Sequence, residues 1–300
     1  MTITEIKAAL AKIGGSANKH LGQHFLIDQQ VLAEIIEAAE IKKGDRVLEI
    51  GPGLGVLTRE LIKCGADVIA IEKDRRLAEY TFNSFPSFDG GKVSSSTRRI
   101  EGIFGDAAKL DWDQFVGDKP WKFVSNLPYA ITSLALRKAL YAKNPPEVVV
   151  VLVQREVAER VLARDGKMSL LALMVGLAVG PVETQNLASN SKQSNPNNPN
   201  IQIIRRVPAE AFYPPPKVES AILKIIPMSH EPRVTLWGIE PEDVMKLAKK
   251  GFAHPRKLVQ RNLEIANSKW QELSSQIGFE IKARAEDLTA KQWAELAKLV

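Results

Sequence analysis

The sequence predicts an α/β protein, with a mostly parallel, doubly wound sheet, an antiparallel edge hairpin and a small all-α C-terminal domain. From Arg46 to about Val153, short apolar runs alternate with stretches of helical periodicity, as they do in βαβ units. After Pro241 the apolar residues keep helical spacing and the strand pattern stops. We therefore expect two domains, formed by residues 1–228 and residues 229–300.

The elements of the predicted sheet follow one another in a regular order. A helix over Val31–Ala39 leads through a turn at 43–45 into the first strand. The five strand candidates, in chain order, are Arg46–Ile50, Asp67–Ile71, Arg99–Phe104, Phe123–Asn126 and Val148–Val153. Leu54–Cys64 has apolar residues at helical spacing and connects the first two strands. Phe85–Thr97 is rich in serine and glycine and lengthens the connection before the third strand.

Three further apolar runs complete the first domain. Val182–Leu187 and Ile201–Val207 are expected to pair as the antiparallel edge hairpin, and Ala221–Ile226 is a strand candidate that ends at Pro227. Ala188–Asn200, which follows the first of these runs, is a low-complexity polar segment that cannot contribute to a core. We expect this segment to form an exposed loop.

Composition and charge restrict the classes of function. The chain has a net charge of +6 and a pI near 9.2, which suits a polyanionic partner because neutralised phosphates release counterions. Its apolar runs are shorter than the ~20 residues of a membrane span, and its first residues lack the pattern of a secretory signal. Cys64 is the only cysteine, which excludes an internal disulfide and a cysteine-rich metal site. We expect a cytoplasmic protein that has no membrane segment and requires no metal.

A glycine-rich loop follows the first strand: Glu49 precedes Gly51, Gly53 and Gly55, and a predicted helix begins directly after them. Such glycines let the backbone approach a ligand closely at the N-terminus of a helix. Two nucleoside cofactors compete for this pattern, but a dinucleotide fingerprint requires a glycine where this chain has Val56. The observed spacing and the acidic Glu49 favour S-adenosylmethionine, because a carboxylate can face its ammonium group. A tight turn without any ligand is the alternative interpretation.

Acidic residues follow the glycine loop at the ends of the next two strands. Glu72 ends the second strand about twenty residues beyond the glycines, where its carboxylate can accept both ribose hydroxyls of a nucleoside. Asp106 follows the third strand, and in this sheet it would lie beside the adenine of the cofactor and accept a proton of its amine. The alternative for Asp106 is an ordinary helix N-cap, a position that aspartate favours.

The tetrapeptide Asn126-Leu127-Pro128-Tyr129 ends the fourth strand, at the edge where open α/β sheets bind ligands. The pattern suits the exocyclic amine of adenine, a poor nucleophile because its lone pair is delocalised into the ring. The Asn126 side-chain oxygen and the Leu127 carbonyl can hold the amine protons. Pro128 fixes the backbone that aims them, and Tyr129 offers a face for stacking a base that has left its own stack. An ordinary turn after a strand is the alternative.

These motifs, in this order, resemble those of the ribosomal RNA adenine dimethyltransferases of the KsgA type, over nearly the whole chain. Gly22–Leu26 resembles the N-terminal cofactor-binding segment of that family, Glu49–Thr58 its first methyltransferase motif, and Asn126–Tyr129 its catalytic motif. Gln154–Arg160 and Phe212–Ser220 resemble two later segments of the family. The resemblance implies a Rossmann-like class I methyltransferase fold with S-adenosylmethionine as the cofactor.

The resemblance also implies the site residues and the substrate. The residues that contact the cofactor would be His24, Leu26, Gly51, Gly53, Glu72, Asp106 and Asn126. Asn126–Tyr129 would act on the target adenine, and Phe212 would stack on its other face. Family membership implies transfer of two methyl groups to each of two adjacent adenines near the 3′ end of small-subunit ribosomal RNA, during ribosome biogenesis. The expected partner is a small-subunit ribosomal particle, and the enzyme is expected to act as a monomer.

The C-terminal region distinguishes this family from relatives that methylate large-subunit ribosomal RNA. Residues 252–263 resemble the basic helix start of the KsgA type, which implies that Arg256, Lys257 and Arg261 bind RNA. Pro255 stands where a basic residue is expected. A solvated helix face is the alternative for the three cations, and a polar residue beside a helix is the alternative for His24.

Two other functions stay open at this point. One is a large-subunit ribosomal RNA or DNA adenine methyltransferase, since the large-subunit relatives share the motifs up to Ser220. The other is a non-catalytic, RNA-binding ribosome assembly factor that keeps a vestigial cofactor site. The intact Asn126, Pro128 and Tyr129 argue against the second of these.

Overall fold

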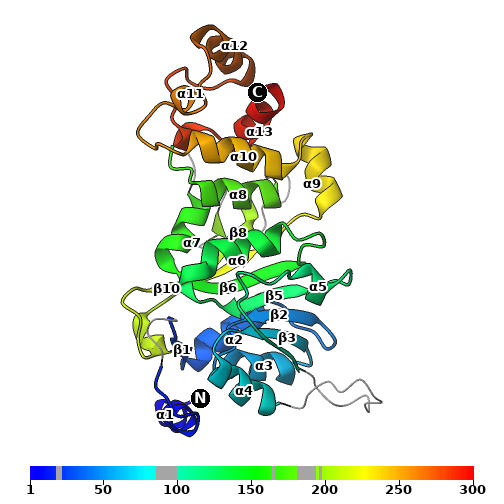
Figure 1. The fold of residues 1–300 in the computed structure, drawn as a ribbon, viewed down its shortest axis with the longest axis vertical. Helices are drawn as coiled ribbons and strands as arrows, with labels where there is room; N and C mark the ends of the chain where they lie inside the picture. Colours follow the sequence, from blue (N-terminus) through cyan, green and yellow to red (C-terminus); the bar gives the residue numbers. More distant parts are fainter. Residues whose placement is uncertain (18–21, 86–99, 164–165, 181–193, 196–197) are drawn as a thin grey trace. The chain divides into compact units, whose positions relative to one another are not determined.

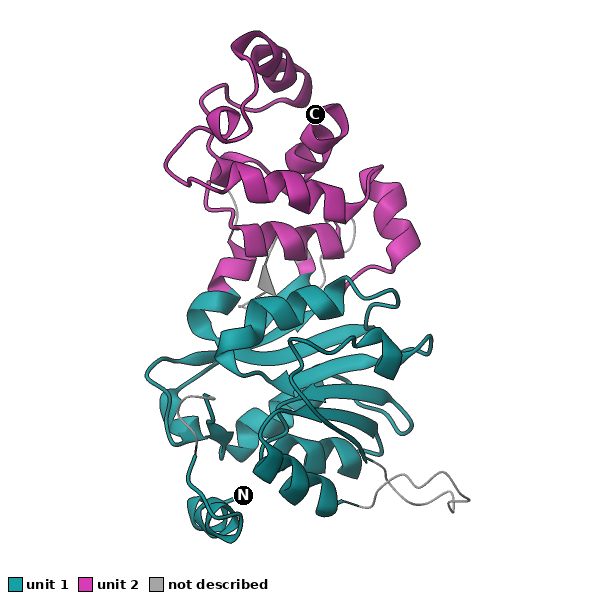
Figure 2. Cartoon of the chain, viewed as in Figure 1, with its two compact units in different colours: residues 1–158, 191–194, 200–226 teal, residues 159–190, 195–199, 227–300 magenta. Residues whose placement is uncertain are grey.

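The chain forms two compact units in a computed structural model that describes residues 1–17, 22–85, 100–163, 166–180, 194–195 and 198–300. Unit 1 comprises residues 1–158, 191–194 and 200–226, and unit 2 comprises residues 159–190, 195–199 and 227–300 (Figure 2). The expected domain boundary after residue 228 lies next to the change of unit at residue 227. Residues 159–190 differ from the expectation, because they belong to unit 2 and not to the first domain.

The central sheet contains eight strands among the described residues, in the order β4-β3-β2-β5-β6-β10-β8-β7 (Figure 1). Their bounds are β2 Arg46–Ile50, β3 Asp67–Glu72, β4 Ile100–Phe104, β5 Lys122–Asn126, β6 Val148–Gln154, β7 Ser194–Asn195, β8 Asn198–Val207 and β10 Ser220–Ile225. Neighbours from β4 to β6 pair in parallel, and β10 pairs antiparallel with both β6 and β8. The expected mostly parallel sheet with an antiparallel edge is confirmed.

The edge hairpin can be compared with its prediction only in part. Ile201–Val207 lies in β8 and pairs with β10, while its expected partner Val182–Leu187 lies outside the described residues. Arg99, the expected first residue of the third strand, lies outside them as well. A second small sheet joins β1 (Phe25–Leu26) to β9 (Phe212–Tyr213) in antiparallel pairing.

Burial explains why these segments form strands and helices. The six residues Val148–Val153 of β6 are all buried, as expected for a strand covered on both faces of a parallel sheet. The helices of unit 1 are α1 Ile3–Lys12, α2 Gln29–Ala38, α3 Val56–Lys63, α4 Arg75–Asn83, α5 Asp113–Val116 and α6 Thr132–Leu140, and α7 Arg155–Leu162 crosses into unit 2. Asp28 caps α2 by accepting the first free backbone N–H groups, as aspartate commonly does.

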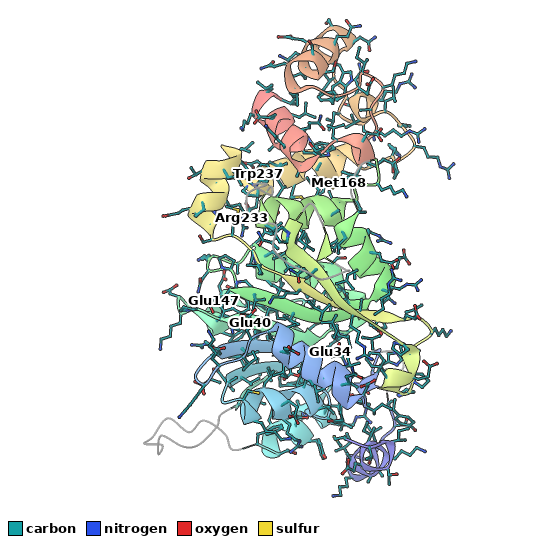
Figure 3. All side chains as sticks on the ribbon, turned by 180° about the vertical axis from the view of Figure 1, so that it is seen from behind. Glu34, Glu40, Glu147, Met168, Arg233 and Trp237 are labelled. Atoms are coloured by element: carbon teal, nitrogen blue, oxygen red, sulfur yellow. The ribbon has the colours of Figure 1, made fainter. Side chains whose placement is uncertain are left out.

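Helix α2 is fastened to the antiparallel side of the sheet by two ion pairs. Glu34 pairs with Arg205 of β8 at 2.7 Å, and Glu40, just after the helix, pairs with Lys224 of β10 at 2.7 Å. Figure 3 labels Glu34 on α2 and Glu40 beyond the last residue of the helix, Ala38. The apolar face of α2 joins α3 and the strands β2, β3 and β6 in one core cluster. Apolar packing and the two ion pairs therefore both hold α2 against the sheet.

Unit 2 is helical and is organised around three buried tryptophans. Its helices are α8 Leu170–Val179, α9 His230–Trp237, α10 Pro241–Gly251, α11 Val259–Asn262, α12 Asn267–Ile277 and α13 Ala290–Leu299. Trp237, Trp270 and Trp293 belong to one core cluster with residues of α8. The Trp237 indole N–H donates to the carbonyl of Leu177 at 2.9 Å, and Figure 3 labels Trp237 on α9. Helix α8 is thus part of this core, although the sequence placed it in the first domain.

The strand order creates a natural ligand site in unit 1. From β2 the chain proceeds to β3 and β4 on one side, whereas β5 and β6 lie on the other side. Open α/β sheets bind ligands at such a switch point, beyond the carboxyl ends of the strands. In the described part of the chain, no helix is both long enough and apolar enough to span a membrane.

Candidate active site

A cavity of about 220 Å³ lies in unit 1 at the carboxyl ends of β2, β3 and β5. Segments far apart in the sequence line it, and together they contain the expected cofactor residues His24, Leu26, Gly51, Gly53, Glu72, Asp106 and Asn126. Leu127, Pro128 and Tyr129 line the same cavity. The structure therefore brings these residues to one place, and their individual roles stay predictions.

The glycine-rich loop needs glycine for backbone conformation and for space. Gly51 has φ +69°, in the left-handed region that other residues rarely adopt, and a Cβ there would lie 3.3 Å from Pro128. Gly55 has φ +73° and directly precedes α3, where a Cβ would lie 2.9 Å from the ring of Phe85. The loop thus presents bare backbone to the cavity, and any side chain at Gly51 would press against the Asn126–Tyr129 segment.

The carboxylate of Glu72 is held in a fixed orientation at the end of β3. One oxygen accepts the backbone N–H groups of Lys73 at 2.8 Å and Asp74 at 2.9 Å, and the other accepts that of Gly53 at 3.1 Å. Burial raises the pKa of Glu72, and these three hydrogen bonds oppose that shift. A carboxylate oxygen has two acceptor sites, so the oxygen that bonds Gly53 keeps one for a ligand hydroxyl.

Asp106 forms a turn and an ion pair, and no helix begins at it. One carboxylate oxygen accepts the backbone N–H of Ala108 at 3.0 Å, and the other accepts the ammonium of Lys73 at 2.8 Å. The hydrogen bond from Lys73 holds the pKa of Asp106 below its usual value. The alternative of a helix N-cap is wrong, since residues 107–109 form only a turn.

The amide of Asn126 is oriented by the backbone of His24. Its Nδ2 donates to the His24 carbonyl at 3.2 Å, which leaves Oδ1, an atom that can only accept, for a ligand donor. The next residue is anchored as well, since the Leu127 N–H donates to the carbonyl of Leu152 at 3.2 Å. Two acceptors, the Asn126 Oδ1 and the Leu127 carbonyl, therefore belong to a segment with a fixed backbone.

The ring of Tyr129 is fixed at its edge and lies beside a second ring. Its hydroxyl shares a hydrogen bond with Ser220 Oγ at 2.7 Å, and the ring of His24 lies nearly parallel to it, with centroids 6.0 Å apart. Burial raises the pKa of Tyr129, so the phenol is neutral. His24 Nδ1 donates to the Pro214 carbonyl at 2.7 Å, which fixes the orientation of the imidazole. Sequence reasoning missed Ser220 and Pro214 as supports of these rings.

A buried serine joins β2 to β5 near the cavity. Ser125 Oγ donates to the carbonyl of Ile50 at 2.7 Å and accepts the N–H of Ile50 at 3.3 Å. The backbone pairing of β2 with β5 covers only Val47 and Leu48, so this side chain replaces the next pair of ladder hydrogen bonds. Ser125 thereby keeps the two strands joined at Ile50, the last residue of β2. Sequence reasoning missed this role, because a serine within a strand does not indicate it.

Phe212 does not join the cavity. Its side chain is 2 % exposed and packs in the core cluster with Leu26 and Ala211, and it is not among the residues that line the cavity. Pairing of β9 with β1 places it there. In this arrangement the ring has no open face on which a base could stack, in contrast to the expectation.

The three expected RNA-binding residues lie on the surface of unit 2. Arg256 and Lys257 are exposed in the turn that follows α10, and Arg261 is exposed on α11. Only Arg261 is therefore helical, whereas the sequence placed all three at a helix start. Their exposure leaves the charges available to a polyanion.

The comparisons with known proteins identify the family. The family model described as ribosomal RNA adenine dimethylase matches residues 14–300. The chain belongs to this family. The "Ribosomal RNA small subunit methyltransferase A" of Dehalococcoides mccartyi strain CBDB1 is 38 % identical over 286 residues, covering 93 % of this chain and 87 % of the relative. The protein of the same name from Nostoc sp. PCC 7120 is 33 % identical over 294 residues, covering 94 % and 97 %.

Solved structures of methyltransferases share the fold of this chain. A dimethyladenosine transferase from Plasmodium falciparum superposes with a TM-score of 0.66 at 25 % identity, covering 91 % of this chain and 96 % of that one. The 23S rRNA methyltransferase ErmE has a TM-score of 0.60 at 24 % identity and shares the fold, with 91 % and 98 % covered. The expected Rossmann-like methyltransferase fold, the class of enzyme and the resemblance to this family are confirmed.

The cavity fits S-adenosylmethionine, the cofactor of this family. Glu49, Glu72 and Asp106 line it, and their carboxyl groups suit a cofactor that carries a sulfonium and an ammonium group. Gly51 and Gly53 offer backbone without side chains at the loop. Of these groups, the Glu72 carboxylate would hold the ribose, the Asp106 carboxylate the adenine amine, and Glu49 would face the ammonium end.

Glu49 makes the stability of the protein depend on pH. Burial raises the pKa of Glu49 to about 8 from its ordinary 4.5, although the Thr58 hydroxyl donates to it at 2.7 Å. The folded protein therefore binds one more proton than the unfolded chain between these values. Stability conferred by the neutral form is complete below pH 4.5, falls as the pH rises towards 8, and levels off above it.

The variant Glu49→Gln is expected to remove this loss of stability. The amide keeps the shape and cannot ionise, so the unliganded variant gains up to about 5 kcal/mol over the parent at alkaline pH. Urea unfolding of both proteins at several pH values measures the gain. Glu37→Gln on the exposed face of α2 should leave the pH dependence unchanged. Equal pH slopes for Glu49→Gln and the parent would contradict the assignment.

Proposed function

We propose that the protein transfers methyl groups from S-adenosylmethionine to the exocyclic amines of two adjacent adenines near the 3′ end of small-subunit ribosomal RNA. The observation that carries the proposal is the orientation of Asn126, whose Nδ2 is bound to His24 so that Oδ1 is left to accept. Asn126 lies in one cavity with the glycine loop and Glu72. The names of the curated relatives support small-subunit ribosomal RNA as the substrate.

The chemistry follows from the two acceptors. S-adenosylmethionine supplies a methyl group on a sulfonium. The Asn126 Oδ1 and the Leu127 carbonyl hold the hydrogens of the adenine amine and draw its lone pair out of the ring plane. When bound, S-adenosylmethionine would give its methyl group to this nitrogen and leave as S-adenosylhomocysteine, and the extra proton of the amine would pass to water. These residues act by position and electrostatics and form no covalent bond.

The target base is bound by stacking. To reach the cavity it must leave its own stack, at a cost of a few kcal/mol. The ring of Tyr129, held by Ser220, offers a face that offsets this cost. Arg256, Lys257 and Arg261 bind phosphates of the same RNA. We propose residues 229–300 as the helical RNA-binding domain that carries them. The net charge of +6 supports such a partner.

Tyr129→Ala is expected to lower kcat/KM for RNA by about tenfold to a hundredfold, because base stacking on an aromatic side chain contributes ~1–3 kcal/mol. Tyr129→Phe keeps the ring and loses only the bond to Ser220, so its loss should stay within severalfold. Single-turnover methylation of RNA measures both. An equal loss in the two variants would show that the hydroxyl, and not stacking, is what matters.

The biological setting is part of the same proposal. The substrate is a small-subunit ribosomal particle during ribosome biogenesis, and the enzyme acts as a monomer in the cytoplasm. A competition experiment tests this substrate: purified protein receives labelled cofactor with unmethylated small-subunit particles, protein-free large-subunit RNA and duplex DNA. We expect methyl transfer to the particles to be at least about tenfold faster than transfer to the large-subunit RNA or to the duplex DNA. Preference for either other nucleic acid would support the alternative methyltransferases, and binding without transfer would support an assembly factor.

A further inference from the structure

Lys73 connects two carboxylates of the cavity, those of Glu72 and Asp106. Its backbone N–H donates to Glu72, and its ammonium forms the ion pair with Asp106 at 2.8 Å. Among the described residues that line the cavity, Lys73 is the one lysine or arginine. The sequence pattern indicated a cofactor-binding role for its neighbour Glu72 and none for Lys73.

The ion pair completes the fixation of the Asp106 carboxylate. The Ala108 N–H donates to Oδ1 at 3.0 Å, and the Lys73 ammonium donates to Oδ2. Because both oxygens are held, the carboxylate cannot rotate freely about its Cβ–Cγ bond. Each oxygen has two acceptor sites, and one on each is used. The hydrogen bond from Lys73 also keeps the pKa of Asp106 low, so the group stays an anion that accepts and does not donate.

A fixed anionic acceptor distinguishes two kinds of purine. A 6-amino group donates to the carboxylate, whereas a 6-oxo group presents a second acceptor and is repelled. A carboxylate that is free to turn can lessen this repulsion and aligns less well with the amine. The discrimination therefore depends on the group that stops the carboxylate from turning.

We propose that Lys73 is a positioning residue that aims Asp106 at the 6-amino group of the cofactor and so sets the preference for adenine over a 6-oxo purine. The inference rests on the proposed function, because it takes this cavity as the S-adenosylmethionine site. Lys73 acts through Asp106: its ammonium is 2.8 Å from Oδ2, and its side chain is 59 % exposed against 22 % for Asp106.

Binding of two ligands of equal charge tests the role. S-adenosylhomocysteine and S-inosylhomocysteine carry equal charge and differ in the 6-substituent and in the hydrogen that a 6-oxo purine carries on N1. The Kd of S-inosylhomocysteine divided by the Kd of S-adenosylhomocysteine therefore cancels the effect of a lost charge. Calorimetry on the full chain should give a ratio that falls about three- to fivefold in Lys73→Met, the range of a partly exposed ion pair. Lys73→Arg keeps the ion pair and should preserve the ratio of the parent.

Two controls separate position from charge. Lys109→Met removes a nearby exposed lysine that acts on Asp106 only through space, and should leave the ratio unchanged. In an Asp106→Asn background, Lys73→Met should have no further effect on the ratio. An unchanged or higher ratio in Lys73→Met would overturn the inference. Failure of the parent to bind S-adenosylhomocysteine would instead contradict the proposed function, so the two failures are distinct.

Discussion

Asn126→Ala is expected to lower kcat/KM for methyl transfer by about a thousandfold while S-adenosylhomocysteine binds within about tenfold of the parent. The variant removes Oδ1, one of the two acceptors that hold the adenine amine, and it also releases the His24 carbonyl. The first loss acts on the transition state, whereas the second loosens only the segment at the edge of the cavity. The rate should therefore fall much further than the affinity for the cofactor product.

Single-turnover kinetics and calorimetry together check this result. Asn83→Ala is the matched control, because Asn83 is exposed at the end of α4 and lies away from the cavity lining. It should keep the activity of the parent. Methyl transfer by Asn126→Ala at the rate of the parent would remove Asn126 from the mechanism and leave the fold assignment intact.

Reversing three charges in unit 2 should weaken binding of RNA by about a hundredfold at moderate salt, because each lost phosphate contact forfeits the release of a counterion. The variant is Arg256→Glu with Lys257→Glu and Arg261→Glu. The slope of log Kd against log salt should also fall by about two to three. All three side chains are exposed, so the change should leave folding and binding of S-adenosylhomocysteine as they are.

The matched control carries the same change of charge elsewhere on unit 2. Lys249, Lys269 and Lys291 are also exposed, and their replacement by glutamate should weaken RNA binding clearly less. Titration of labelled small-subunit RNA at several salt concentrations measures both variants. Equal losses would show that net charge alone, and no particular surface, attracts the RNA.

The sheet could be predicted because its strands are buried runs. In β6 every residue from Val148 to Val153 is covered, and such a run indicates a central parallel strand whatever its neighbours are. Helix α8 shows the limit of this reasoning. Leu170–Val179 is apolar around its whole circumference, so it has no face that indicates a partner, and the sequence could not assign it to unit 2.

The cavity residues that end or follow a strand could be predicted from the sequence. The contacts between distant segments that support them could not. Glu72 and Asn126 end parallel strands, so topology alone brings them to one edge of the sheet. The bond from Tyr129 to Ser220 and that from His24 to Pro214 join distant segments, and no periodicity encodes such pairs. Phe212 was expected at the cavity from a motif, but pairing of β9 with β1 turns it into the core.

Mapping of the methylated nucleotides tests the central claim most directly. The protein and labelled S-adenosylmethionine are incubated with unmethylated small-subunit particles, and the RNA is digested and analysed by mass spectrometry and primer extension. We predict dimethyladenosine at two adjacent positions near the 3′ end, and its absence with Asn126→Ala. Label on other bases, or on adenines elsewhere in the RNA, would contradict the assignment of this cavity to those two adenines.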